Sequence, residues 1–117
     1  MKKIILDTNF LIDSIKFKID LYEQLKGFDI YTIKPVIEEI NLISKSCKKD
    51  SKYAKLVLKI YNKIKIIEIT GNSDDILLNL SNEYIIATQD SVLRKKIKNK
   101  KGKLAYIRQK KYIVLEE

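Results

Sequence analysis

The stretch KKIILDTNFLI, residues 2–12, decides the fold, because it reads as a short apolar strand that ends in a carboxylate. Ile4, Ile5 and Leu6 form an unbroken apolar run directly before Asp7. Such a run is typical of a strand that is buried on both faces in a parallel sheet. A carboxylate that closes a central strand should be partly buried, which makes Asp7 the first candidate for a functional residue.

The rest of the chain alternates between segments with strand character and segments with helix character. We expect strands at residues 3–7, 30–33, 66–69, 84–87, 104–107 and 112–115, and helices at residues 9–16, 21–26, 35–45, 52–64, 74–82 and 91–98. Pro35 is tolerated in a first helical turn, and Ser73 can cap the helix that follows it. The alternation predicts an α/β fold, with a mainly parallel sheet and helices on both of its faces. No Ser/Gly-rich linker or internal repeat divides the 117 residues, so we expect a single domain.

Three further acids stand where a strand gives way to a helix or where a helix has just begun: Glu39, Asp74 and Asp90. In a parallel α/β sheet, ligands bind outside the carboxyl ends of the strands. Helical geometry, at about 100° per residue, separates Glu39 from its neighbour Glu38. Glu39 falls beside the apolar stripe of its helix, whereas Glu38 points nearly opposite. The same reasoning favours Asp74 over Asp75.

These acids have a structural explanation as well as a functional one. The helix dipole stabilises an acid in a first turn, so Asp74 and Asp90 could be helix caps. Asp13, inside the first helix, is expected to be an ordinary surface acid. Carboxylates that converge on Asp7 would raise one another's pKa values unless a cation neutralised them. Several convergent carboxylates in a chain without histidine therefore indicate a site for a divalent metal ion.

The composition narrows the chemistry further. The absence of histidine excludes a Ser-His-Asp triad, a Cys-His pair and a Cys/His zinc site. Neither of the common glycine-rich phosphate-binding motifs occurs. The single cysteine, Cys47, cannot form an internal disulfide and fits a reducing, cytoplasmic compartment. No apolar run approaches the ~20 residues of a membrane-spanning helix, so no membrane partner is expected.

The charge balance favours a polyanionic partner. The chain has 24 Lys and Arg residues against 15 Asp and Glu residues, a formal net charge of +9. Such cations bind phosphates through counterion release, although a solvated lysine-rich surface explains the same numbers. Tyr106 and Tyr112 could stack on bases, but core packing explains them equally well. The basic residues that flank the Asp90 helix and could hold RNA are Arg94, Lys95, Lys96, Arg108 and Lys110.

Four segments, in this order, resemble a PIN-domain nuclease: IILDTNFLI, KPVIEEINLI, SDDILLNLS and YIIATQDSVLRKKI. The resemblance covers essentially the whole chain and implies a PIN-like, three-layer α/β/α fold. It implies polar support from Thr8 or Asn9 and from Thr88. Gln89 is a small departure, because close relatives tend to have asparagine there. The acidic metal site that the resemblance implies consists of Asp7, Glu39, Asp74 and Asp90.

The resemblance also implies an activity and partners. The activity would be hydrolysis of RNA phosphodiesters with Mg²⁺, or with Mn²⁺ in its place, since an all-oxygen site suits either ion. The chain is similar to archaeal VapC-type toxins and to PIN nucleases of rRNA processing, which implies a cognate antitoxin or a pre-ribosome as partner. A homodimer is expected from the family, and the helix at residues 52–64 carries apolar surface at Leu56 and Ile60 that could serve it.

Two other functions remain open from the residues alone. A phosphatase could use Asp7 as its nucleophile, but such enzymes usually need a second aspartate two residues later, where Asn9 stands. A non-catalytic RNA-binding or scaffold module could keep the same fold. The presence of all four acids argues against that module, because an inactive relative would have little need for them.

Overall fold

The computed structural model describes residues 2–116, in which strands and helices alternate as the sequence predicts. The strands are β1 (Lys3–Leu6), β2 (Asp29–Ile33), β3 (Lys65–Ile67), β4 (Ile85–Ala87), β5 (Leu104–Arg108) and β6 (Tyr112–Glu116). The helices are α1 (Thr8–Lys16), α2 (Leu21–Gln24), α3 (Lys34–Ser44), α4 (Ser51–Ile60), α5 (Ser73–Leu80) and α6 (Ser91–Asn99).

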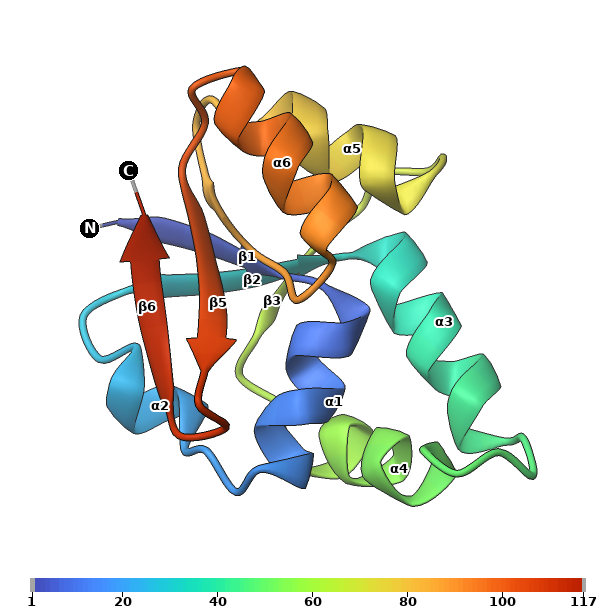
Figure 1. Cartoon of the computed structure of the whole chain (residues 1–117). Helices are drawn as coiled ribbons and strands as arrows, with labels where there is room; N and C mark the ends of the chain where they lie inside the picture. Colours follow the sequence, from blue (N-terminus) through green and yellow to red (C-terminus); the bar gives the residue numbers. More distant parts are fainter. Residues whose placement is uncertain (1, 117) are drawn as a thin grey trace.

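The strands form one six-stranded sheet in the order β3-β2-β1-β4-β5-β6 (Figure 1). All neighbouring pairs are parallel except β5 and β6, which form an antiparallel pair. Strand β1 lies inside the sheet, between β2 and β4, and its residues Ile4, Ile5 and Leu6 are 0% exposed. The carboxyl ends of β1, β2, β3 and β4 therefore meet at one edge of the sheet, which places the segments that carry the four acids there.

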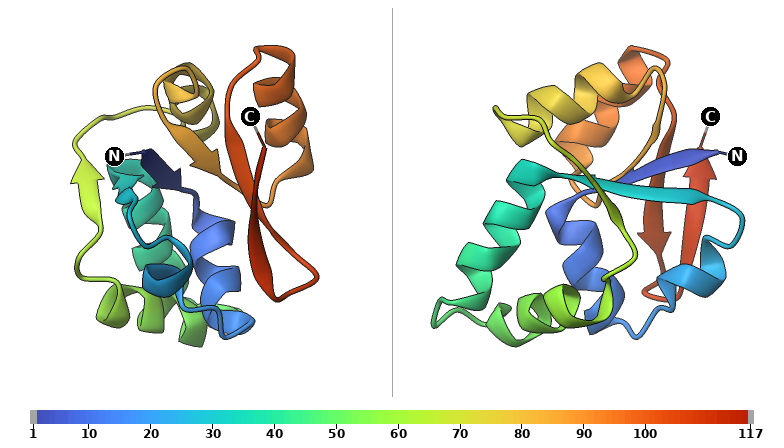
Figure 2. Two further views of the ribbon diagram at one scale, coloured as in Figure 1. Left: turned by 90° about the vertical axis from the view of Figure 1, so that its left-hand side faces the viewer. Right: turned by 180° about the vertical axis from the view of Figure 1, so that it is seen from behind.

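Helices cover both faces of the sheet, so the molecule has three layers. Helices α1, α3 and α4 pack on one face, and α5 and α6 pack on the other (Figure 2). Helix α2 lies beside the β5–β6 hairpin, to which the Gln24 side chain is hydrogen-bonded. Each layer contributes to one apolar core, to which Phe10 and Leu11 of α1 and Leu93 and Ile97 of α6 belong. The predicted mainly parallel α/β architecture is confirmed.

Helix α4 is shorter than the apolar spacing of residues 52–64 predicts. It ends at Ile60, and Tyr61 leaves the helical conformation with φ −92° and ψ 62°. The Tyr61 hydroxyl lies 2.9 Å from the Ser14 hydroxyl, and its ring meets that of Tyr22 edge-on at 5.8 Å. These contacts turn the chain toward the sheet, where β3 starts at Lys65, one residue earlier than expected.

The start of α5 also differs from the prediction. Asn72, not Ser73, is the N-terminal cap, because its side-chain oxygen accepts a hydrogen bond from the Asp75 N–H at 3.1 Å. Ser73 is the first residue of the helix itself. Asp74 is thus inside the first turn without being the cap.

None of the helices within residues 2–116 is both long enough and apolar enough to cross a membrane.

Candidate functional site

Asp7 lies at the carboxyl end of β1, where its side chain is held from two sides. Its Oδ1 accepts a hydrogen bond from the Thr8 N–H at 2.7 Å, and its Oδ2 accepts one from the Thr88 hydroxyl at 2.9 Å. The Asp7 N–H donates to the Ala87 carbonyl at 2.9 Å, which continues the pairing of β1 with β4. Only 8% of Asp7 is exposed. The expectation that this carboxylate is partly buried is therefore confirmed.

The surroundings of Asp7 disfavour its charged form. Burial raises the pKa of the Asp7 carboxyl, whereas the hydrogen bonds from Thr88 and Thr8 lower it. The negative charges of Asp74 and Glu39 raise it again. The net direction is upward from the ordinary value of 3.8. A cation placed among these three carboxylates would favour the charged form of Asp7 and so act against the rise in its pKa.

Asp90 stands close to Asp7 through a shared partner, the buried Thr88 hydroxyl. This hydroxyl donates to Asp7 and accepts a hydrogen bond from the Asp90 N–H at 3.2 Å. The Asp90 carboxylate caps α6, since its Oδ1 accepts from the N–H groups of Val92 at 2.8 Å and Leu93 at 3.3 Å. Both bonds end on Oδ1, so Oδ2 lies outside the cap. Asp90 is thus a cap, as one reading of the sequence allowed, and is also tied to Asp7.

Glu39 and Asp74 are exposed and reach the site from opposite layers. Glu39 lies in α3, which follows β2, and Asp74 lies in the first turn of α5, which follows β3. Their neighbours Glu38 and Asp75 are exposed as well, so being exposed does not separate the members of either pair. Electrostatics does separate them, because the two carboxylates that raise the pKa of Asp7 are Asp74 and Glu39.

The donor set has the chemistry of a Mg²⁺ or Mn²⁺ site, because all of its side-chain donors are carboxylate or hydroxyl oxygens. As they stand, however, the acids are not drawn into one coordination sphere. Within residues 2–116, no group of three or more Asp, Glu, Cys or His side chains is close enough to hold a metal ion. The residues fit the ion by the chemistry of their donor atoms.

The other polar residues predicted for the site are divided between the interior and the surface. Thr8 is buried directly after Asp7, and Thr88 is 0% exposed, whereas Asn9 is exposed. Of the pair Thr8 and Asn9, Thr8 is thus the one that contacts the Asp7 carboxylate, through its backbone N–H.

Asp13 differs from its prediction as a surface acid. It is only partly exposed, and burial raises the pKa of its carboxyl. The charge of Lys16 and a hydrogen bond from the Gln89 side chain lower that pKa in part. Sequence reasoning missed this contact, because Gln89 stood out only as a departure from the family pattern. No sequence spacing signals it, since the two residues lie on separate elements.

The basic residues predicted to bind RNA lie on α6 and on the β5–β6 hairpin. Lys95, Lys96, Arg108 and Lys110 are exposed. Arg94 is partly buried, and its guanidinium lies over the ring of Tyr106 at 4.6 Å from the ring centroid. One face of the Tyr106 ring is therefore covered, which favours the packing role for this tyrosine over base stacking.

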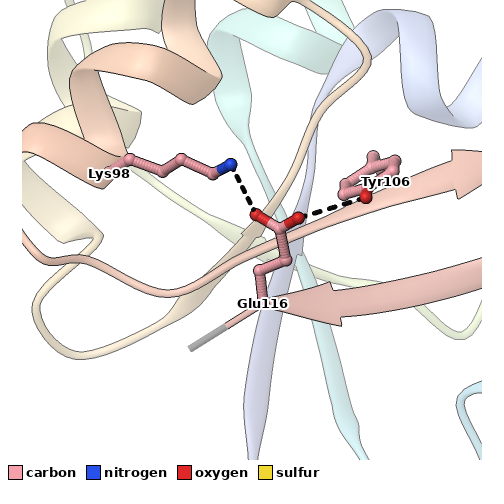
Figure 3. A network of polar contacts seen from close by, with 3 residues as sticks. All are labelled: Lys98, Tyr106 and Glu116. Atoms are coloured by element: carbon pink, nitrogen blue, oxygen red, sulfur yellow. Dashed lines mark hydrogen bonds and ion pairs between the residues drawn. The ribbon is translucent and has the colours of Figure 1, made fainter.

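A carboxylate at the end of β6 joins α6 to the hairpin. The Glu116 carboxylate lies 3.0 Å from the Lys98 ammonium and accepts a hydrogen bond from the Tyr106 hydroxyl at 3.1 Å (Figure 3). The hydrogen bonds from Lys98 and Tyr106 lower the pKa of Glu116. Helix α6, which begins beside Asp90, is thus fastened to the sheet at its far end.

An apolar cavity of about 220 Å³ lies elsewhere, among α1, α3, α4 and β3. Leu11, Ile37, Val57 and Ile66 are among the residues that line it, and none of the four acids does so. The four acids lie outside this cavity, on the segments that follow the carboxyl ends of the strands and that together form a rim there.

Comparisons with known proteins agree with this fold. A family model described as a PIN like domain matches residues 4–110. Ribonuclease VapC4 of Methanocaldococcus jannaschii is 32% identical to this chain, over 96% of this chain and 95% of its own length. The structure of the PIN domain endonuclease Utp24 matches with a TM-score of 0.77 and 21% identity, over 97% of this chain and 90% of that one. A domain of a functionally unknown protein from the same Methanocaldococcus species matches with a TM-score of 0.68 and 18% identity, over 92% of each chain.

Proposed function

The chain belongs to the family of PIN-like domains, and from this membership we propose that it is a metal-dependent endoribonuclease with a four-carboxylate site. The observation that carries the proposal is the buried Asp7 carboxylate, whose pKa is raised by burial and by the charges of Asp74 and Glu39. A buried carboxyl whose pKa is raised by burial and by neighbouring acids is a frequent feature of functional sites, which supports this proposal.

The residues that would hold the ion are Asp7 and Asp90, with Glu39 and Asp74 completing the shell directly or through water. A bound Mg²⁺ or Mn²⁺ would supply Lewis acidity, both to activate water and to neutralise charge on the phosphate. Thr88 keeps Asp7 and Asp90 in register through its shared hydroxyl. The Thr8 N–H fixes the rotation of the Asp7 carboxylate.

The RNA would be held by the basic residues beside this rim. Phosphates are attracted by Lys and Arg whatever the base sequence, which suits a chain with a net charge of +9. Arg94 stands one helical turn after Asp90 with its guanidinium over the Tyr106 ring, which supports its use as one of these phosphate contacts. Lys95, Lys96, Arg108 and Lys110 would extend the contact.

The cellular role that we propose follows the relatives. One relative is named a VapC ribonuclease and a structural neighbour is named the endonuclease Utp24. The role is accordingly that of a toxin of a toxin–antitoxin pair or of an rRNA-maturation nuclease, in the cytoplasm, with an antitoxin or a pre-ribosome as partner. Helix α4 exposes Leu56 (40%) and Ile60 (46%), which supports its use as a homodimer surface.

The second candidate function is a non-catalytic RNA-binding module with the same fold. One observation favours it: the acids of residues 2–116 are not gathered closely enough to hold a metal ion as they stand. The two functions differ in whether RNA is cut or only bound.

The experiment that separates them is cleavage of a structured RNA by the purified protein in Mg²⁺ or Mn²⁺. EDTA and the Asp7→Asn variant serve as the two controls. We expect cutting that requires the ion and disappears in both controls. Equal cutting by Asp7→Asn would trace the activity to a contaminant, and binding without any cutting would support the non-catalytic module.

A further inference from the structure

Gln89 stands between Thr88 and Asp90, and its side-chain amide reaches back to a neighbouring strand. Its Oε1 accepts a hydrogen bond from the Ile107 N–H of β5 at 2.7 Å, and its Nε2 lies 3.5 Å from the Ile107 carbonyl oxygen. The side chain is partly buried, and Ile107 is 7% exposed. The amide thus pairs with β5 as a peptide group of a strand would.

The Gln89 side chain bonds β5 directly beyond the point where the main-chain hydrogen bonds between β4 and β5 end. The last such bond runs from the Thr88 N–H to the Ala105 carbonyl at 3.0 Å. Beyond it the chain turns away into α6, and the next inward N–H of β5, that of Ile107, is bound by the Gln89 side chain. Because a buried N–H without a partner is costly, this bond holds the β4–α6 loop against β5.

The same amide also reaches the helix that Asp7 caps. The Gln89 amide also lies close enough to the Asp13 carboxyl of α1 to lower the pKa of that carboxyl, and Asp7 is the N-terminal cap of α1. Gln89, which belongs to the loop that carries Thr88 and Asp90, therefore bonds β5 and lies beside α1. Its orientation is determined, because Oε1 must face the Ile107 N–H and the amide hydrogens must face oxygen.

We propose that Gln89 is a positioning residue, which holds the Asp90 loop against β5 and α1 so that the Asp7 and Asp90 carboxylates stay in register for the same ion. This inference rests on the proposed nuclease function and adds a residue to it. Gln89 does not touch the reacting atoms. It acts through Thr88 and Asp90, whose backbone it fixes.

The test uses one disruptive variant and one variant that restores the contact. Gln89→Leu has a similar size but leaves the Ile107 N–H and the Asp13 carboxyl without the amide. The double variant Gln89→Glu/Asp13→Asn keeps the formal net charge and reverses the polarity of the contact. Its new carboxylate still accepts from Ile107, and its new amide donates to that carboxylate.

The matched control is Gln24→Leu. Gln24 makes the same kind of contact, accepting from the Ile113 N–H at 2.9 Å and donating to the Lys111 carbonyl at 3.2 Å, and it joins α2 to the hairpin away from the acids. Three quantities are measured on each variant: kcat and KM for RNA cleavage, Mn²⁺ affinity by calorimetry, and the exchange rate of the Asp90 amide proton by NMR.

We expect Gln89→Leu to lower kcat by about tenfold or more with KM within about twofold, because a catalytic group that is misplaced by a fraction of an ångström loses rate. Its Mn²⁺ affinity should fall and its Asp90 amide should exchange faster. The double variant should return all three toward the wild type, and Gln24→Leu should change none of them.

The inference would be overturned if Gln89→Leu kept the kcat, the Mn²⁺ affinity and the Asp90 amide exchange rate of the wild type. It would also be overturned if Gln24→Leu lost as much kcat and Mn²⁺ affinity as Gln89→Leu. If the wild-type protein neither binds Mn²⁺ nor cuts RNA, the proposed nuclease function fails. The Asp90 exchange rate then still decides whether Gln89 holds the loop.

Discussion

At the scale of single residues, the charged form of the Asp7 carboxyl is subject to opposing effects. As a cap of α1 it accepts hydrogen bonds, which favour its charged form, but burial and the charges of Asp74 and Glu39 disfavour that form more strongly. A group in this position costs the metal-free fold some stability. Such a cost is common at functional sites, where activity and stability compete.

Asp7→Asn is therefore expected to stabilise the metal-free protein at neutral pH while removing its activity. The folded state holds the Asp7 proton more tightly than the unfolded chain, so the contribution of Asp7 to stability is greatest below pH 3.8 and is lost as the pH rises through the raised pKa. Urea unfolding in EDTA should show the variant to be more stable than the wild type near pH ~7 and equal to it near pH ~3. A wild type that is the more stable protein near neutral pH would contradict this reading of Asp7.

Thr88→Val should disturb both carboxylates that its hydroxyl joins. The variant removes the donor to Asp7 and the acceptor for the Asp90 N–H, at a cost of about 1–3 kcal/mol for the buried groups left without partners. The pKa of Asp7 should rise further, because the Thr88 hydrogen bond lowers it. An NMR titration of the Asp7 carboxyl carbon measures this shift. Thr88→Ser, which keeps the hydroxyl, should behave like the wild type, and a lowered pKa in Thr88→Val would refute the role given to this bond.

At the scale of secondary-structure elements, apolar periodicity predicts which segments are strands and helices but not where each one ends. The run Ile4–Leu6 predicts β1 correctly, because a short, unbroken apolar run is typical of a strand that is buried on both faces. The end of α4 could not be read in the same way. Ile60 and Ile64 keep helical spacing, yet Tyr61 leaves the helix to contact Ser14 of α1, which is distant in sequence.

The cap of α5 gives a test at this scale, because the sequence offers two adjacent candidates. Asn72→Ala should lower the free energy of unfolding by about 1 kcal/mol, since its side chain bonds the Asp75 N–H at the start of the helix. Ser73→Ala should change it by no more than about 0.5 kcal/mol, because Ser73 lies inside the helix and makes no cap bond. Urea unfolding of the two variants measures both changes in the free energy of unfolding. A larger loss in Ser73→Ala than in Asn72→Ala would show that Ser73 is the cap.

At the scale of the whole molecule, the order of the strands brings together residues that the sequence predicts only as separate candidates. Asp7 and Asp90 follow β1 and β4, which are neighbours in space although 81 residues separate Asp7 from Thr88. The rule that ligands bind outside the carboxyl ends of parallel strands predicts this location for the acids. The Gln89 contacts with Asp13 and Ile107 were not predictable, because they depend on how the loop after β4 folds against two other elements.

The net charge of +9 gives a prediction about RNA binding for the whole molecule. Arg94→Gln and Lys26→Gln each lower that charge by one, but Lys26 precedes β2 at the opposite end of the sheet from the acids. For single-stranded RNA, the slope of log K against log salt should fall in magnitude by about 0.7 in Arg94→Gln and stay unchanged in Lys26→Gln. Fluorescence anisotropy in Ca²⁺, at several salt concentrations, measures both slopes. Equal slopes for the two variants would show general attraction without a contact at Arg94.

The measurement that tests the central claim most directly is calorimetric titration of Mn²⁺ into the wild type and two matched pairs of variants. Each variant replaces a single acid by the corresponding amide, and the two variants of a pair differ only in which of two neighbouring acids is replaced. The pairs are Glu39→Gln beside Glu38→Gln, and Asp74→Asn beside Asp75→Asn. If the four carboxylates form one metal site around Asp7, Glu39→Gln and Asp74→Asn weaken binding while Glu38→Gln and Asp75→Asn leave it as in the wild type. Equal affinities within both pairs, or a wild type that binds no Mn²⁺, would contradict the claim.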